Sequence, residues 1–313
     1  MAEGRERGGT GRDRTGRPLA REVKSLTHGE FWIPERERSI YQEALRALNA
    51  AGVPYVVSGL YAIYEYTGIY RKTKDLDLFF EPREVVGAAR VLKDAGFRVQ
   101  LEQVHWLAKA TKEGVLVDLI YGMGNGLEFI DEDWYRHSRP GILAAVPVRI
   151  APAEELLWHR LFVSERHRWD MADIVHLVVI HGDRLDWGRI LRRAGDHWRL
   201  LAAQVHLFDY CYPGHRRRIP AWVREELFER AFEEPETDDA GRVCQGTLIS
   251  RFSFAIDVNE WGFRDPRAES VARARATAII REIGRNDVWA ERSEPGRRPE
   301  SGGGAARSEP GGA

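Results

Sequence analysis

The feature that most constrains the fold is a six-residue run, Asp-Leu-Asp-Leu-Phe-Phe, at residues 75–80. Acidic and apolar residues alternate through its first four positions, which predicts a β-strand with two different faces. The leucines would face a core, and Asp75 and Asp77 would project together from the opposite face. Two carboxylates this close repel each other unless a cation lies between them, and paired oxygen ligands suit Mg²⁺ that bridges substrate phosphates. The run therefore predicts a metal site on one face of a sheet.

A short buried strand and a helix precede this run. Residues 55–57, Tyr-Val-Val, form the strand, which Ser58 and Gly59 interrupt. Glycine lets the backbone approach a ligand closely, and the helix predicted over residues 60–66 would direct its first amides at an anion bound there. Ser58 and Gly59 are therefore candidate phosphate contacts.

Lysines flank Thr73 just before the acidic run. Most basic residues of the chain are arginine, so Lys72 and Lys74 stand out. We interpret Thr73 and Lys74 as further candidate contacts for a bound nucleotide. The alternative is that the lysines are solvated charges at the start of a strand.

A third acid lies in a later apolar run. Residues 115–120, Val-Leu-Val-Asp-Leu-Ile, predict a buried strand, and a carboxylate within it needs a partner. We expect Asp118 to converge on Asp75 and Asp77 from a neighbouring strand, because three carboxylates can hold two divalent ions about 4 Å apart for phosphoryl transfer. The alternative is that Asp118 caps a turn or forms an ion pair with an arginine.

The chain divides near residue 151. It has 313 residues, 43% of them hydrophobic, enough for two domains plus tails. Before residue 151, predicted strands alternate with helices; after it, apolar residues recur almost wholly at helical spacing. We expect a first domain over residues 35–150 and a helical domain over 151–290. Glycine- and arginine-rich segments predict disordered tails at 1–21 and 291–313.

The turn at Ser58 and Gly59, the acid pair and Asp118 follow one another in an order that resembles the nucleotidyltransferase superfamily typified by DNA polymerase beta. The resemblance is closest to its small bacterial AbiEii-like and minimal members. It implies an α+β fold, in which a mixed β-sheet flanked by helices is followed by a helical C-terminal domain.

The same resemblance implies an activity. Asp75, Asp77 and Asp118 would be the catalytic residues and the ligands of two Mg²⁺ ions, and Ser58 and Gly59 would contact the triphosphate. The reaction would move a nucleotidyl group from an NTP to a hydroxyl of an RNA end, a protein or a small molecule.

The resemblance extends into the helical half. Residues 152–156, Pro-Ala-Glu-Glu-Leu, are similar to a segment that opens a helix in the AbiEii-like proteins. That helix bears a lysine in the family, and His159 or Arg160 occupies the corresponding region here.

The next similar segment covers residues 166–173. Asp170 and Asp173 are spaced to share one helical face, where we expect them to orient Arg166 or Arg168. A solvated helix face is the alternative.

Partners and location follow from charge and cysteine usage. A net charge of −1 excludes a generic polyanion binder, although the His-Arg-Arg-Arg cluster at residues 215–218 can be interpreted either as an RNA contact or as an exposed loop. Cys211 and Cys244 lie far apart in the chain, no apolar run is long enough to span a membrane, and no secretory signal is recognisable. We expect a cytoplasmic protein that does not bind membranes.

Two classes of function stay open. One is the metal-dependent nucleotidyltransferase, whose three acids are all present. The other is a catalytically inactive nucleotide- or RNA-binding module, with a cognate antitoxin or another partner protein in a toxin–antitoxin pair.

Overall fold

The computed structural model describes residues 31–165, 168–233, 240–283 and 288–289. The tails predicted at 1–21 and 291–313 lie outside these residues. Within the described ranges, no helix combines the length and the apolar character needed to cross a membrane.

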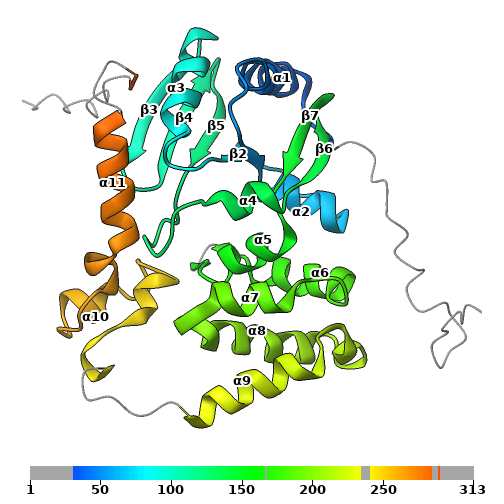
Figure 1. Cartoon of the computed structure of the whole chain (residues 1–313), viewed down its shortest axis with the longest axis vertical. Coiled ribbons are helices and arrows are strands. Elements are labelled where there is room, and N and C mark those ends of the chain that lie inside the picture. Colours follow the sequence, from blue (N-terminus) through cyan, green and yellow to red (C-terminus); the bar gives the residue numbers. More distant parts are fainter. Residues whose placement is uncertain (1–30, 166–167, 234–239, 284–287, 290–313) are drawn as a thin grey trace, which may run out of the picture.

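Seven strands form one sheet in the order β3-β4-β5-β2-β1-β7-β6 (Figure 1). The strands are β1 (Val56–Val57), β2 (Asp75–Phe79), β3 (Arg98–Gln103), β4 (Leu107–Lys112), β5 (Val115–Ile120), β6 (Arg139–Leu143) and β7 (Val146–Ile150). The central strand β2 runs parallel to β5 and antiparallel to β1. The sheet is therefore mixed, which confirms the predicted α+β fold.

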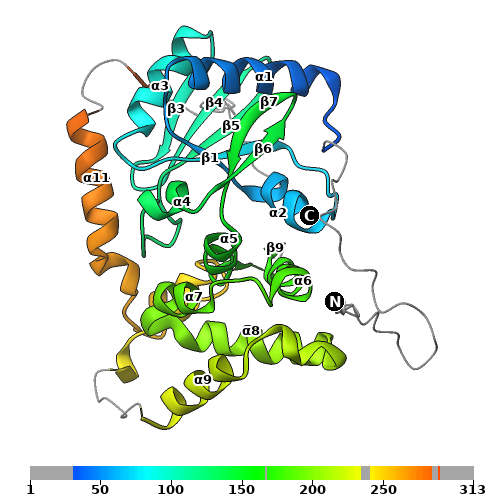
Figure 2. The same cartoon turned by 45° about the vertical axis from the view of Figure 1, so that its right-hand side comes forward.

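Two helices, α1 (Glu35–Ala50) and α3 (Val85–Asp94), lie together over one face of the sheet (Figure 2). α1 buries the apolar positions that helical spacing predicts. Glu81 and Pro82 predict the start of a helix, but α3 begins only at Val85. The reason is a turn closed by the Glu84 amide, which donates to the Glu81 carbonyl at 2.9 Å.

Two strand features differ from the sequence prediction. β6 was not predicted, because Pro140 and Gly141 are poor strand residues; the strand lies at the edge of the sheet, where proline is tolerated. The apolar pattern predicts a strand from Val104 to Ala110, but β4 begins only at Leu107, since residues 104–106 form the turn that joins it to β3. This turn carries Trp106 toward the site described below.

Helices make up most of the second half of the chain (Figure 1). They are α5 (Ala153–Arg160), α6 (Met171–His181), α7 (Trp187–Ala194), α8 (Trp198–Cys211) and α9 (Ala221–Glu233), followed by the shorter α10 (Ala255–Asn259) and by α11 (Val271–Ile283). A two-stranded ribbon of β8 (Ser164–Glu165) and β9 (Arg168–Trp169) separates α5 from α6. The prediction of an almost wholly helical segment missed this ribbon.

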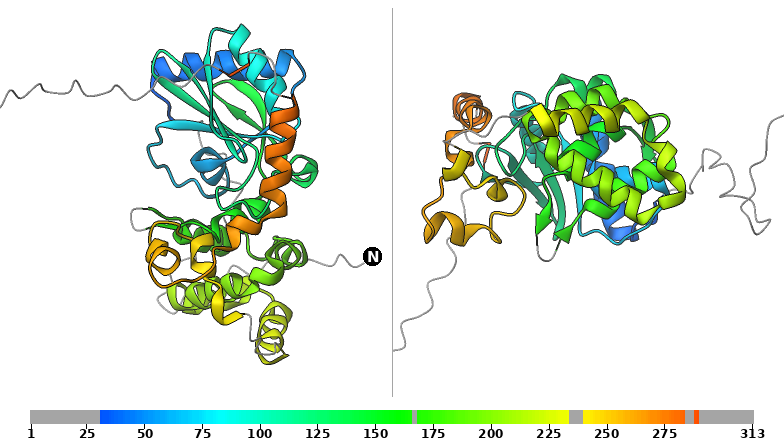
Figure 3. Two further views of the ribbon diagram at one scale, coloured as in Figure 1. Left: turned by 90° about the vertical axis from the view of Figure 1, so that its left-hand side faces the viewer. Right: turned by 90° about the horizontal axis from the view of Figure 1, so that it is seen from below.

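The last described helix, α11, returns to the sheet layer (Figure 3). α11 runs along one flank of the molecule, from the helical layer toward the sheet (Figure 3). Near its start, Ser270 donates a hydrogen bond to the Gly126 carbonyl, and the Asn125 amide donates to the Leu248 carbonyl at 3.2 Å. Residues beyond 240 therefore contact the first half of the chain directly, and the division at residue 151 stays a prediction.

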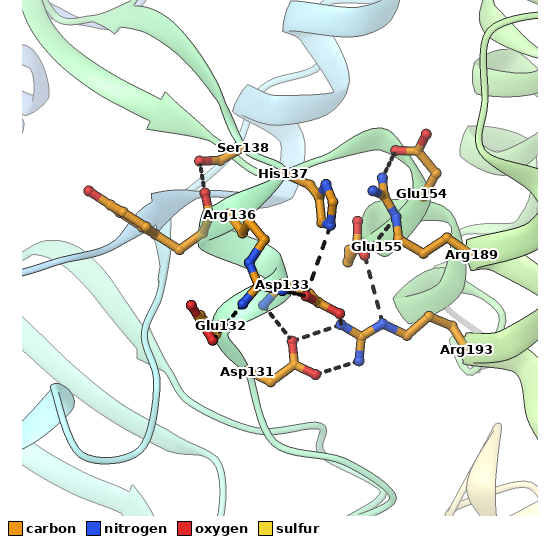
Figure 4. A network of polar contacts seen from close by, with 11 residues as sticks. Asp131, Glu132, Asp133, Arg136, His137, Ser138, Glu154, Glu155, Arg189 and Arg193 are labelled. Atoms are coloured by element: carbon orange, nitrogen blue, oxygen red, sulfur yellow. Dashed lines mark hydrogen bonds and ion pairs between the residues drawn. The ribbon is translucent and has the colours of Figure 1, made fainter.

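An ion-pair network also joins the two halves (Figure 4). We call it the Arg193 network, and it consists of Asp131, Asp133, Glu154, Glu155, Arg189 and Arg193. Arg193 of α7 donates to both carboxylate oxygens of Asp131, at 2.5 and 2.7 Å. Asp131 caps the N-terminus of α4 (Glu132–Arg136), so the network fixes α4 against α7.

Candidate active site

The turn after β1 lies against the acidic strand. The Ser58 amide donates to the Asp77 carbonyl at 3.0 Å. Gly59 has a φ of +60°, and a Cβ atom at this position would lie 1.8 Å from the Asp77 Oδ2 atom. Glycine is therefore required here because the carboxylate of Asp77 lies against it, and the phosphate contacts of Ser58 and Gly59 stay predictions.

The three predicted acids lie next to one another in the sheet. Asp77 of β2 is the direct partner of Asp118 in the parallel strand β5, and Asp75 is two residues before Asp77 on the same strand. All three line one pocket of about 370 Å³. The structure thus brings together the acids that the sequence predicted to converge, while Leu76 and Leu78 are fully buried on the other face.

Thr73 holds one of these acids. Its hydroxyl donates to the Asp75 Oδ1 atom at 2.8 Å, and Thr73 itself lines the pocket. Lys74 is exposed and is not among the lining residues. Phosphate contacts from Thr73 and Lys74 stay predictions; the contact that the structure describes is one that orients Asp75.

Asp118 is the most buried of the three acids, with 8% of its surface exposed. Burial raises its pKa; the nearby Lys109 ammonium opposes this shift and the charge of Asp75 adds to it. The Lys109 Nζ atom lies 3.3 Å from the Asp118 Oδ1 atom across the β4–β5 ladder. Asp118 therefore does form an ion pair, as the alternative interpretation held, but with a lysine, and it lines the pocket as well.

The donor chemistry suits a hard cation. In the described part of the chain, no three His, Cys, Asp or Glu side chains are arranged to hold a metal ion by themselves. Mg²⁺ in nucleotide sites usually binds one or two carboxylates and completes its shell with substrate phosphates and water. The adjacent carboxylates of Asp75, Asp77 and Asp118 are donors of this kind, and their role as metal ligands stays a prediction.

Two arginines, Arg71 and Arg160, line another part of the pocket together with Asp170. Both arginines contact Asp173, which is not among the lining residues, and we call Arg71, Arg160 and Asp173 the Asp173 cluster. The Arg160 Nε atom lies 3.1 Å from the Asp173 Oδ2 atom, and the Arg71 Nη2 atom lies 2.5 Å from the Asp173 Oδ1 atom. Arg160 also donates from Nη2 to the Gly59 carbonyl at 3.3 Å. One carboxylate on α6 thus orients two arginines beside the glycine turn.

The partners that the structure describes for Asp173 are Arg160 of α5 and Arg71, which precedes β2. The sequence predicted that Asp170 and Asp173 orient Arg166 or Arg168. Arg166 and the side chain of Arg168 lie outside the described part of the chain, so this stays a prediction. Asp170 lies at the N-terminus of α6 and lines the pocket.

Sequence reasoning missed two lining residues, Arg71 and Trp106. The basic run at residues 71–74, directly before the acids, was the available signal for Arg71, but only Thr73 and Lys74 were predicted from it as contacts. Trp106 lies in the turn between β3 and β4, and its ring packs 3.6 Å from the position that a Cβ atom on Gly124 would take. Nothing in the local sequence distinguishes it from a core tryptophan.

A protein-family model matches the chain. The matching family model is described as an uncharacterised nucleotidyltransferase, and the match covers residues 18–211, more than half of the chain. No curated protein matches the sequence.

Solved structures show more distant similarity. The antibiotic-resistance factor ANT(2″)-Ia, in its solution structure, is 20% identical with a TM-score of 0.41, over 56% of this chain and 98% of that one. The lincosamide antibiotic adenylyltransferase LnuA, bound to lincomycin, is 19% identical with a TM-score of 0.34, over 47% and 98%. JHP933 from Helicobacter pylori is 13% identical with a TM-score of 0.32, over 64% and 97%. Similarity at this level is too distant to indicate a substrate.

Proposed function

Because the chain belongs to this nucleotidyltransferase family, we propose that it transfers a nucleotidyl group from an NTP to a hydroxyl of an acceptor, with Asp75, Asp77 and Asp118 as its catalytic residues. One observation carries the proposal. The three carboxylates lie on adjacent strands around one pocket, and Gly59 allows the backbone to contact one of them.

The transfer exchanges one bond at the α-phosphorus of the NTP for another. The acceptor oxygen forms a bond to the α-phosphorus of the NTP, and the bond from that phosphorus to the bridging oxygen of the β-phosphate breaks. Pyrophosphate leaves with the electron pair, and the hydroxyl proton passes to Asp118. Two Mg²⁺ ions, held by Asp75, Asp77 and Asp118, would supply positive charge that neutralises the phosphates. The amides at the start of α2 (Gly59–Thr67) would face the triphosphate, as helix N-termini do.

The finer parts of the proposal rest on sequence features alone. Residues 152–156 support a relationship to the AbiEii-like proteins. This relationship would imply a cognate antitoxin as a partner. RNA as the acceptor is supported by the basic cluster at 215–218, where Arg216 and Arg218 also form ion pairs with Asp209 and Asp183. A cytoplasmic location is supported by the two isolated cysteines.

The decisive experiment compares three proteins in a transfer assay. The wild type, Asp77→Asn and the control Asp94→Asn, which changes an exposed acid on α3, are each incubated with Mg²⁺ and every α-labelled NTP. Bulk RNA, total protein, tobramycin and lincomycin serve as acceptors. We expect Asp94→Asn to match the wild type and Asp77→Asn to lose transfer. Equal labelling by all three proteins would exclude Asp77 from catalysis, and a wild type that neither transfers nor binds NTP would contradict the proposed function.

A further inference from the structure

The Asp173 cluster differs from an ordinary ion pair in how its members are exposed. The side chains of Asp173 and Arg160 are 3% and 4% exposed, whereas that of Arg71 is 42% exposed. Arg71 nevertheless contacts the buried carboxylate and lines the pocket. A buried anion therefore holds an exposed cation at the edge of the site.

The position of the cluster relative to the acids defines one end of the pocket. Arg160 donates to the carbonyl of Gly59, and Gly59 lies against the carboxylate of Asp77. Strand β1, which leads to Gly59, is on one side of β2, and β5, which carries Asp118, is on the other. The cluster is therefore at the end of the pocket opposite Asp118.

The geometry of phosphoryl transfer predicts which substrate group lies at each end of the pocket. The attacking oxygen and the leaving oxygen lie roughly in line across the phosphorus. If the acceptor hydroxyl is beside Asp118, the leaving pyrophosphate must point away from Asp118, toward Gly59 and the Asp173 cluster. This is also where the amides of α2 begin.

We propose that Arg71 binds the β- and γ-phosphates of the NTP, and that Asp173 is a positioning residue that holds Arg71 there. The inference rests on the proposed function and adds a residue and a direction to it. As the bond from the α-phosphorus to the bridging oxygen breaks, negative charge accumulates on pyrophosphate, and the Arg71 guanidinium balances this charge without giving up a proton.

The role of Asp173 follows from the cost of ordering an exposed arginine. An arginine free in solvent loses rotamer entropy when it binds a ligand. The 2.5 Å contact with Asp173 fixes the guanidinium before the ligand arrives. An arginine carries more donors than one carboxylate oxygen accepts, so Arg71 can contact Asp173 and a phosphate together.

Inorganic pyrophosphate with Mg²⁺ is a suitable probe, because it does not depend on the base of the NTP. Binding is measured by calorimetry for the wild type, Arg71→Ala, Arg71→Lys and Asp173→Asn, with Arg90→Ala on α3 as an exposed control. The four NMPs are titrated in parallel, since they lack the β- and γ-phosphates.

We expect Arg71→Ala to weaken pyrophosphate binding about 10- to 100-fold, the worth of a hydrogen bond to a charged group. Arg71→Lys should recover part of this loss, and Arg90→Ala should bind as the wild type does. NMP binding should be the same in Arg71→Ala as in the wild type, which a general structural defect would not allow. Asp173→Asn should weaken pyrophosphate binding in the same direction as Arg71→Ala.

Two results would overturn the inference, and they are distinguishable. If the wild type binds pyrophosphate and Arg71→Ala binds it equally well, Arg71 does not contact these phosphates, while the proposed function stands. If the wild type binds neither pyrophosphate nor any NTP, the proposed function fails together with the inference. Should Asp173→Asn fail to fold, the two Arg71 variants and the NMP control decide the outcome alone.

Discussion

The Asp173 cluster and the Arg193 network both connect the helical half to the sheet layer, but their charges are arranged in opposite ways. In the Asp173 cluster, one buried carboxylate contacts two arginines. In the Arg193 network, four acids surround two arginines whose side chains are only 11% and 12% exposed. Arginines outnumber acids in the first set of contacts, and acids outnumber arginines in the second.

The difference in charge and exposure suits the Asp173 cluster to bind a ligand and the Arg193 network to hold two helices together. Arg71 is exposed and lines a pocket, so the Asp173 cluster can accept an additional anion. In the Arg193 network, Arg193 is bound by both oxygens of Asp131 and also contacts Asp133 and Glu155. The acids of the network disfavour a further anion there, and the network serves to hold α4 against α7.

Removing an anion should therefore have unequal effects in the two places, and this is the largest effect we expect. Asp173→Ala leaves the buried guanidinium of Arg160 without this carboxylate, and it should reduce the free energy of unfolding by about 3–5 kcal/mol. Asp131→Ala should cost about 1 kcal/mol, because Arg193 keeps Asp133 and Glu155 as partners. Urea unfolding of both variants measures the difference. Equal losses in the free energy of unfolding would show that the two carboxylates contribute equally to stability.

The tolerance of the turn next to the Asp173 cluster provides the second test. Gly59→Ala places a Cβ atom 1.8 Å from the Asp77 Oδ2 atom, so the carboxylate or the turn must move. A displacement of about 1 Å at reacting groups typically lowers the rate about 100-fold. We expect a loss of that order in the transfer assay. Gly87→Ala on α3, where a Cβ atom would meet nothing within 4 Å, is the matched control and should retain activity. If both variants are equally active, the turn is not part of the site.

The features that could be predicted from the sequence are those that a local pattern specifies. The strand from Asp75 to Phe79 could be, because its alternation is local and fixes which side chains share a face. The position of Asp118 next to Asp77 could be inferred, because a buried acid in an apolar strand needs a polar partner. The pairing of Arg71 with Asp173 could not, because the two residues are 102 positions apart and nothing in either local pattern specifies the other.

The burial of Glu155 in the Arg193 network could not be predicted either. Glu155 occurs in a segment recognised as a helix start, yet its complete burial comes from packing against α7. A charged residue near a helix N-terminus is expected to be exposed, so the sequence gives no sign of a buried carboxylate. Tertiary contacts between distant helices determine this environment.

The pH dependence of stability is the smallest effect and tests the network directly. Burial raises the pKa of Glu155 from 4.5 to about 7, although Arg189 and Arg193 lower it in part. The folded state therefore holds a proton that the unfolded state releases at lower pH. This contribution is fully present below pH 4.5 and is lost as the pH rises through about 7. The wild type should lose on the order of 2 kcal/mol of stability between pH 5 and pH 7.5 from this group.

Glu155→Gln isolates that contribution, because a glutamine is of similar shape and does not titrate. Urea unfolding at pH 5, 6, 7 and 8 should show the variant losing less stability than the wild type as the pH rises. Glu229→Gln, which changes an exposed acid on α9 away from the network, is the control and should keep the pH dependence of the wild type. Parallel curves for the wild type and Glu155→Gln would mean that Glu155 is ionised throughout this range. The Arg193 network would then hold one more negative charge, and its contrast with the Asp173 cluster, where two arginines contact one acid, would be larger.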